Sequence, residues 1–134
     1  MYKKIIVALS LEHQIADRAL TAAKALADDG AEIIAVHVTE PLQGSVRVFI
    51  SDEDLGKVQA ATADMLAERL QGHTGITSVI LEGKAGQALS DYAAKVSADC
   101  IVVGSHKPGL SDHLLGSTAS RIARHAPCSV HVLR

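Results

Sequence analysis

Short runs of consecutive apolar residues, rich in Ile and Val, recur at intervals along the chain. There are five such runs, at positions 4–9, 32–38, 77–81, 100–103 and 129–133. Most of them are apolar on consecutive rather than alternate positions, which is typical of strands that are covered on both faces, as in a parallel sheet. The pattern therefore predicts five buried strands.

The segments between these runs have the three- and four-residue spacing of amphipathic helices. Apolar stripes predict three helices, which carry Ile15, Ala19, Ala22 and Leu26, then Leu55, Val58, Met65, Leu66 and Leu70, then Leu89, Ala93 and Val96. A further helix is predicted to begin near Gly116 and Ser117 and to stop before Pro127. Its buried positions are expected to be Ala119, Ile122 and Ala123.

Predicted strands and helices alternate along the whole sequence. Right-handed crossovers between parallel strands place helices on both faces of an open sheet. We therefore expect an α/β fold, a Rossmann-like, doubly wound, five-stranded parallel sheet with helices on both faces. A chain of 134 residues fits one such domain, at positions 1–134. The connection at positions 39–52 is long for a compact domain, and loops of that length are more often functional or mobile than idle.

The composition of the chain argues against two classes of partner, nucleic acids and membranes. Hydrophobic residues make up 48% of the chain and charged residues 21%, as in an ordinary globular protein. Aromatic residues make up only 2% and the formal net charge is −2, so neither base stacking nor a basic surface favours a nucleic-acid partner. No stretch approaches the roughly 20 apolar residues of a membrane span, and no membrane partner is expected.

The first residues resemble the start of a secretory signal, because Lys3 and Lys4 precede an apolar run. The run ends at Glu12 without a small-residue cleavage pattern, however, and a buried strand explains it better. We therefore expect a cytoplasmic protein. Cys100 and Cys128 lack metal-ligand spacing and are expected to be small, reduced core residues rather than a disulfide.

The predicted sheet also places a ligand site. In a doubly wound sheet, ligands bind beyond the carboxyl ends of the strands, at the point where the strand order reverses. Here this rule predicts a crevice between the first and fourth strands. Its expected lining is residues 8–11, Val38 and Thr39, and the residues that follow Val103.

The segment after the fourth strand suits a phosphate group. Gly104 and Gly116 allow the backbone to approach a ligand closely, and the first N–H groups of a helix form an anion site. Ser117 and Thr118 add hydroxyl donors, while Lys107 supplies a charge or is simply solvated, and both interpretations stay open. An ordinary helix start capped by Ser117 is the alternative. Capping does not explain two glycines at the crevice, so a phosphate site is favoured.

Four stretches then resemble the C-terminal signature of the universal stress proteins. Positions 102–106, 114–117, 124–128 and 130–132 read Val-Val-Gly-Ser-His, Leu-Leu-Gly-Ser, Arg-His-Ala-Pro-Cys and Val-His-Val. Positions 2–8 and 31–38 are similar to the first two strands of that family, so the resemblance covers nearly the whole chain. Lys107-Pro108, with 114–117 after it, is similar to the small F- and G-type branch, which is grouped with the nucleotide binders.

The resemblance implies a nucleotide site. Nucleotide-binding members carry Gly, two residues, Gly, nine residues, Gly, and then Ser or Thr. Gly104, Gly116 and Ser117 match, but Lys107 replaces the second glycine, the next interval is one residue shorter, and the usual Asp after the first strand is Ser10. The likeness implies ribose and phosphate contacts at the matching residues and backbone recognition of adenine near Val38. The expected nucleotide-binding residues are Ala8, Leu9, Ser10, Val38, Val103, Gly104, His106, Lys107, Gly116, Ser117 and Thr118.

We expect the ligand to be ATP, with any Mg²⁺ held mainly by the phosphates, and its occupancy to act as a regulatory switch. The resemblance also implies a homodimer through the last strand, at positions 130–133, whose exposed edge needs a partner. Two alternatives stay open: a nucleotide-free homodimeric interaction module, and slow ATP hydrolysis or autophosphorylation at Ser105, Ser117 or Thr118. No catalytic residue is assigned, because the sequence has no Walker or nucleophile-elbow motif and no placed general base.

Histidines offer one further alternative. A zinc site from His106, His113 and His125 is conceivable, because these residues are predicted near the same end of the sheet. Their spacing follows no ligand rule, so solvent-facing or capping roles are favoured and no metal ligand is assigned. His37 lies in a predicted strand and is expected to be structural.

Overall fold

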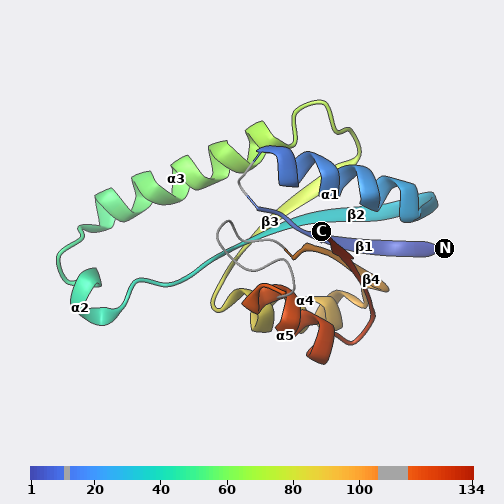
Figure 1. The fold of residues 1–134 in the computed structure, drawn as a ribbon. Coiled ribbons are helices and arrows are strands. Elements are labelled where there is room, and N and C mark those ends of the chain that lie inside the picture. Colours follow the sequence, from blue (N-terminus) through green and yellow to red (C-terminus); the bar gives the residue numbers. More distant parts are fainter. Residues whose placement is uncertain (11–12, 106–114) are drawn as a thin grey trace.

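The computed structural model describes residues 1–10, 13–105 and 115–134. In chain order its elements are β1 (Tyr2–Ala8), α1 (His13–Leu26), β2 (Ala27–Thr39), α2 (Gly44–Arg47), α3 (Asp52–Arg69), β3 (Ile76–Glu82), α4 (Ala85–Val96), β4 (Cys100–Gly104), α5 (Ser117–His125) and β5 (Ser129–Leu133). The strands form one five-stranded sheet in the order β3-β2-β1-β4-β5, and every pairing is parallel. Helices α1 and α3 lie on one face and α4 and α5 on the other (Figure 1). The predicted fold is confirmed.

The central strands are buried on both faces, as their sequences predict. In β1, Ile5 and Val7 pack into the core beneath α1, while Ile6 packs into the core beneath α4 and α5. In β4, Val102 and Ile101 divide between the same two cores. Successive residues of a strand point to opposite faces, so a strand between two helical layers must be apolar at every position.

The two edge strands differ from this expectation. In β3, Thr77, Ser78, Ile80 and Glu82 are exposed. In β5, Ser129 is exposed and the other residues are only partly buried. The prediction that these runs would be covered on both faces is therefore wrong for β3 and β5. Both are edge strands, and the helices leave part of their surface exposed.

The buried faces of two helices are also shifted from the predicted stripes. In α1 the buried positions are Ala16, Ala19, Leu20 and Ala23, while Ile15, Ala22 and Leu26 are only partly buried. In α5, Ala119 and Ile122 are buried but Ala123 is exposed. Helix positions rotate by about 100° per residue, so a tertiary contact can select either of two neighbouring apolar stripes.

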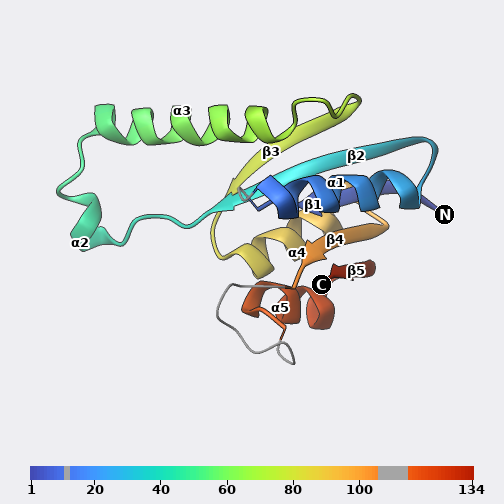
Figure 2. The same cartoon turned by 45° about the horizontal axis from the view of Figure 1, so that its top comes forward.

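Helix α3 departs furthest from its prediction. Of its 18 residues only Leu66 is buried, whereas Val58 and Met65, both on the predicted apolar stripe, are 60% and 40% exposed. Figures 1 and 2 both show α2 and the N-terminal part of α3 extending beyond the sheet. We call residues 40–62, which include α2 and this part of α3, the arm. The arm has little of the protein to pack against, which is why its apolar side chains stay exposed.

Both cysteines are free thiols, as expected. Cys100 is buried in β4 and Cys128 is partly buried before β5. Burial, with smaller contributions from Cys128 and Asp99, raises the pKa of the Cys100 thiol to about 11. Burial, with Asp99, also raises the pKa of Cys128. Thiols that stay protonated at neutral pH are poor nucleophiles, so these residues act as small apolar groups.

Candidate functional site

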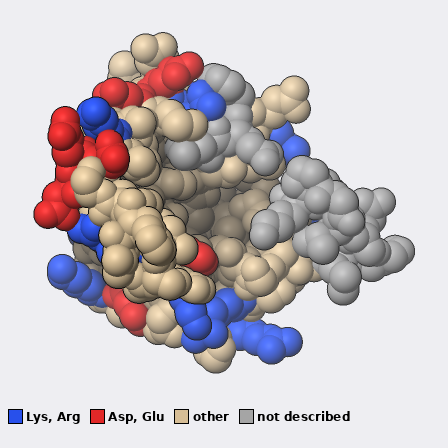
Figure 3. All heavy atoms as spheres, turned by 90° about the vertical axis from the view of Figure 1, so that its left-hand side faces the viewer, with Lys and Arg blue, Asp and Glu red and all other residues tan. Residues whose placement is uncertain are grey.

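The reversal of strand order falls where the sequence places it. From β1 the chain continues outward through β2 and β3, and it then crosses to the other side of β1 to form β4 and β5. The carboxyl ends of these strands face the side of the molecule seen in Figure 3, which is hollowed at its centre. The β1–β4 boundary is thus the expected position for a ligand in this class of fold.

Backbone contacts to β2 hold the end of β1. The N–H of Leu9 donates to the carbonyl of Val36 at 2.8 Å. The ring Nδ1–H of His37 donates to the carbonyl of Leu9, with 3.2 Å between the heavy atoms. The side chain of Leu9 lies in the core beneath α1, while its neighbours Ala8 and Ser10 are partly exposed. Leu9 therefore anchors the end of β1, and His37 has the structural role that the sequence predicts.

At the end of β4, the two glycines lie where close contacts leave little room for a side chain. A Cβ atom at Gly104 would approach Cγ2 of Ile15 to 3.3 Å, so the glycine allows α1 to lie against this strand end. A Cβ atom at Gly116 would lie 3.3 Å from the carbonyl oxygen of Ser105. The N–H of Gly116 donates to that same oxygen at 3.0 Å. Residues 105 and 116 are therefore joined by a backbone hydrogen bond just beyond the end of β4.

Ser105 also connects the end of β4 to the last strand. Its N–H donates to the carbonyl of Leu133 at 2.8 Å, and the residue is 96% buried. One residue thus bonds through its N–H to the end of β5 and through its carbonyl to the start of α5. Sequence reasoning considered Ser105 only as a phosphoryl acceptor and missed this link, which no local pattern signals.

Helix α5 begins at this edge of the sheet without a side-chain cap. Gly116 is the N-cap residue, and no side chain there accepts a hydrogen bond from the helix. Ser117 is the first helical residue and is exposed, and Thr118 is partly exposed. The alternative in which Ser117 serves as the cap is therefore wrong. The first N–H groups of a helix have no partner within the helix, so this helix start and its two adjacent hydroxyls supply the kind of donors that an anion requires.

The position of α5 depends on α4. A Cβ atom at Gly86 would lie 2.8 Å from Cδ and 2.9 Å from Cβ of Arg121, so the two helices can approach closely only because residue 86 is glycine. The guanidinium of Arg121 then donates to Oε1 of Gln87 at 2.7 Å. Sequence reasoning missed Gly86, although a glycine inside a predicted helix is a signal of close packing.

The remaining predicted residues fall into three groups. Val103 is buried and Val38 is partly buried, and both pack against the same core at the carboxyl ends of their strands. Thr39 is turned away from it, because its hydroxyl donates to the carbonyl of Leu81 in β3 at 3.3 Å. His106 and Lys107 lie outside the described residues.

The described part of the chain contains neither a cluster of metal ligands nor a membrane-spanning helix. Within residues 1–10, 13–105 and 115–134, no group of three or more His, Cys, Asp or Glu side chains is placed to hold a metal ion. Of the three histidines considered for zinc, only His125 is described, and it is exposed. In the described part of the chain, no helix is both long enough and apolar enough to cross a membrane.

The long connection after β2 encloses a second hollow that the sequence did not reveal. A cavity of about 690 Å³ lies between the arm and the end of β3. Its lining includes Thr39 and Glu82 but none of the predicted nucleotide-binding residues that the structure describes. The length of the 39–52 connection was the only signal for it in the sequence.

Comparisons with known proteins identify the family. The model of the universal stress protein family matches residues 1–134. The chain is 32% identical over 143 residues to universal stress protein G of Shigella flexneri, and the match covers 100% of both chains. It is similar in fold to a universal stress protein in complex with cAMP, with a TM-score of 0.70, 24% identity and coverage of 99% of this chain and 97% of that one. A family protein from Arabidopsis thaliana with AMP bound gives a TM-score of 0.61, 20% identity and coverage of 98% and 90%. The chain belongs to the universal stress protein family.

Proposed function

We propose that this protein binds an adenine nucleotide, ATP in particular, in the crevice between β1 and β4 and uses occupancy as a regulatory signal in the stress response. The observation that carries the proposal is the start of α5, where the N-cap residue Gly116 has no side chain to accept from the helix N–H groups and the hydroxyls of Ser117 and Thr118 lie in the first turn. Two proteins of similar fold have been crystallised with cAMP and with AMP, which supports an adenine nucleotide as the ligand class.

Each part of the nucleotide has a matching part of the crevice in this proposal. Phosphate oxygens accept from the first N–H groups of α5 and from the two hydroxyls, where the positive end of the helix dipole favours negative charge. The ribose lies near Gly104 and Ser10. Adenine lies against the end of β2, where backbone groups near Val38 read its edge. Mg²⁺, when present, is held mainly by phosphate oxygens, because it prefers oxygen ligands and keeps several waters.

Occupancy becomes a signal only if the bound form differs from the free form in affinity. Ser105 offers a route, since it bonds to Gly116 at the proposed phosphate site and to Leu133 at the end of β5. A shift of the start of α5 on phosphate binding would therefore reach the edge strand. We propose that this edge forms the homodimer and that the protein acts in the cytoplasm.

Thermal denaturation with ATP tests the proposal. A ligand that binds only the folded state at about 100 times its Kd stabilises the protein by about 2.7 kcal/mol, so Tm should rise by several degrees. In Gly116→Val the new side chain meets the carbonyl of Ser105, and the ATP-dependent rise should be lost. Gly56→Val is the matched control, because a Cβ atom there meets no atom within 4 Å. A denatured sample checks for nucleotide retained through purification.

No change in Tm and no retained nucleotide would overturn nucleotide binding. The alternative would then be the nucleotide-free homodimeric interaction module, which the incompletely covered strand β5 supports. Light scattering tests the dimer in either case, and a monomer at micromolar concentration would contradict it. Autophosphorylation is tested separately by mass spectrometry after incubation with ATP, since a phosphate on Ser117 or Thr118 should disappear in the corresponding Ala variants.

A further inference from the structure

The cavity beneath the arm is a second candidate binding site, which we call the arm pocket. It is lined by Thr39, Glu40, Pro41, Leu42, Arg47, Ile50, Leu55, Val58, Gln59, Thr62, Ile80, Leu81 and Glu82. Its volume of about 690 Å³ is within the range of pockets that hold small organic molecules. None of its described lining residues belongs to the proposed nucleotide site, so it is a separate candidate site.

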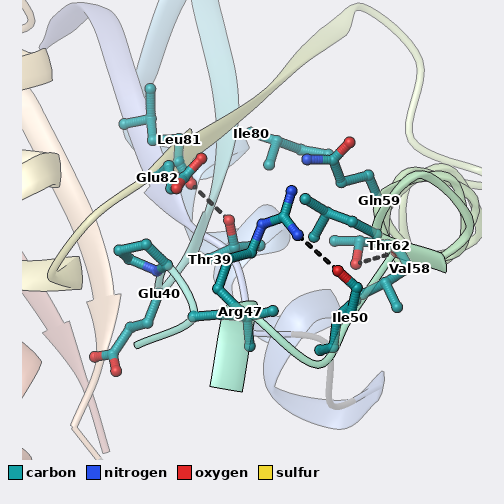
Figure 4. Close-up of a pocket in the computed structure, with 13 residues that line it drawn as sticks. Thr39, Glu40, Arg47, Ile50, Val58, Gln59, Thr62, Ile80, Leu81 and Glu82 are labelled. Atoms are coloured by element: carbon teal, nitrogen blue, oxygen red, sulfur yellow. Dashed lines mark hydrogen bonds between the residues drawn. The ribbon is translucent and has the colours of Figure 1, made fainter. Parts of the chain in front are cut away.

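The walls of the arm pocket are apolar and only partly covered. Ile80 projects from β3 and Val58 from α3 on opposite sides of the cavity, and they are 41% and 60% exposed (Figure 4). Ile50 and Leu42 from the arm complete this surface. Large apolar side chains exposed together around a concavity are typical of ligand-binding grooves. The apolar walls predict a ligand with an apolar body.

The charged groups of the pocket decide which head group such a ligand carries. The guanidinium of Arg47 is already engaged, because Nη1 donates to the carbonyl of Ile50 at 2.7 Å and Nη2 pairs with the carboxylate of Asp52. Its positive charge is therefore offset within the arm. Glu40 and Glu82, by contrast, have no hydrogen-bond or ion-pair partner among the residues that the structure describes.

These two carboxylates belong to the ends of neighbouring strands. Thr39 of β2 pairs in register with Glu82 of β3, and Glu40 is the next residue along the chain. In Figure 4, Glu82 lies beside Thr39 at the strand ends, while the carboxylate of Glu40 points outward from the apolar side chains. The pocket thus has apolar walls and an acidic rim on one side.

We propose that the arm pocket binds a small organic cation with an apolar body, such as a protonated amine that carries an aromatic or alkyl group. The apolar body lies between Val58 and Ile80, and the ammonium group lies at the rim beside Glu82, with Glu40 adding to the negative potential. An anionic ligand of the same shape is disfavoured, because it would meet two carboxylates that have no partner among the described residues and a guanidinium that is already paired.

A matched pair of probes tests this proposal without any nucleotide. The compounds 4-phenylbutylamine and 4-phenylbutyrate share an apolar body and carry opposite charges at neutral pH. Titration calorimetry should detect binding of the amine and not of the carboxylate. Methyl NMR should show the largest shifts at Ile50 and Ile80, because these two isoleucines line the pocket.

Two exposed variants and one control locate the site. Glu82→Gln should weaken binding of the amine by about two- to fivefold, the range expected for one solvent-exposed ion pair. Val58→Ser should weaken it by removing apolar contact, and both residues are exposed enough for the fold to persist. Asp64→Asn changes the charge of α3 by the same amount outside the pocket and should leave binding unchanged.

Three results would overturn the proposal. Binding of the carboxylate as tightly as the amine would mean that Arg47 rather than Glu82 governs recognition. Failure of both compounds to bind at millimolar concentration would mean that the pocket takes no such ligand. Binding of the amine that is unaffected by Glu82→Gln and by Val58→Ser would place it elsewhere on the protein.

Discussion

Helices α1 and α3 lie on the same face of the sheet, yet they make very different use of their apolar residues. Helix α1, with 14 residues, buries Ala16, Ala19, Leu20 and Ala23. Helix α3 is longer, at 18 residues, and buries only Leu66. Figure 2 shows α1 lying along the central strands, whereas α3 follows the edge strand and continues past it. An apolar stripe therefore predicts a helix, but whether the residues of that stripe are buried depends on which other elements the helix packs against.

The comparison implies that stability and adaptability are divided between two parts of the molecule. Around α1 and the central strands, side chains are fully enclosed, so any change in volume must be absorbed by the core. In the arm, Val48 and Phe49 are 81% and 88% exposed and contribute little to the folded state. The arm is consequently the part that can vary its residues to suit a ligand or partner at small cost in stability.

The largest contrast should come from shortening one apolar side chain in each helix. Leu20 is fully buried in the core beneath α1, so Leu20→Ala leaves a cavity and should lower the free energy of unfolding by about 3 kcal/mol. Val58→Ala in α3 should change it by less than about 0.5 kcal/mol. Urea denaturation measures both. Equal losses would show that the arm is packed as tightly as the core.

Glycine substitutions should produce effects of opposite sign. In Gly86→Ala the new Cβ meets the stem of Arg121 at 2.8–2.9 Å, and overpacking outweighs the gain in helix propensity, for a net loss of about 1–2 kcal/mol. In Gly56→Ala, within α3, the Cβ meets no atom within 4 Å, and the protein should gain about 0.5–1 kcal/mol. Thermal denaturation of the two variants gives the signs directly. Stabilisation by both would contradict the close contact between α4 and α5.

A third test compares a carboxylate in the body with one in the arm. Burial opposes the ionisation of Asp99, but hydrogen bonds from the backbone N–H groups of Lys3 and Lys4, at 2.9 and 3.0 Å, outweigh it and hold its pKa below the usual value. Asp99→Asn should cost about 1 kcal/mol at pH 7. Asp52→Asn in the arm should cost less, because that side chain is 93% exposed.

The pH dependence of the Asp99 effect has a definite sign. A carboxyl group with a depressed folded-state pKa stabilises the protein above its unfolded pKa of about 3.9, and this contribution is lost as the pH falls through the folded-state value. The difference between the original protein and Asp99→Asn in urea denaturation should therefore be constant near neutrality and shrink below about pH 4. A difference that grows on acidification would refute the assignment.

The smallest effect should come from the surface ion pair within α3. Glu53 and Lys57 are four residues apart, 3.8 Å separates their charged atoms, and both side chains are more than 70% exposed. Lys57→Gln should cost no more than about 0.5 kcal/mol, and the cost should vanish in molar salt. A larger, salt-independent loss measured by chemical denaturation would mean that Lys57 has a structural role in the arm.

Much of the architecture was predictable because its signal is local. Residues 5–9 and 100–103 are apolar at every position, which already implies strands between two helical layers. The alternation of strands and helices then leaves few topologies, and the carboxyl edge of the sheet follows from them. Gly104 and Gly116 stand out for the same reason, since glycines beside a strand end and a helix start mark close approach of backbone.

What the sequence could not supply depends on contacts between distant segments. Val58 is exposed because α3 extends past the end of β3 and has little there to pack against (Figure 2). Ser105 connects two elements only because folding brings Leu133 and Gly116 beside it. The arm pocket likewise exists only because the arm passes over the end of β3. Local periodicity determined which segments became strands and helices, whereas tertiary packing decided which of their faces were covered. The reason is that burial requires two surfaces in contact, and the sequence of one segment specifies only one of them.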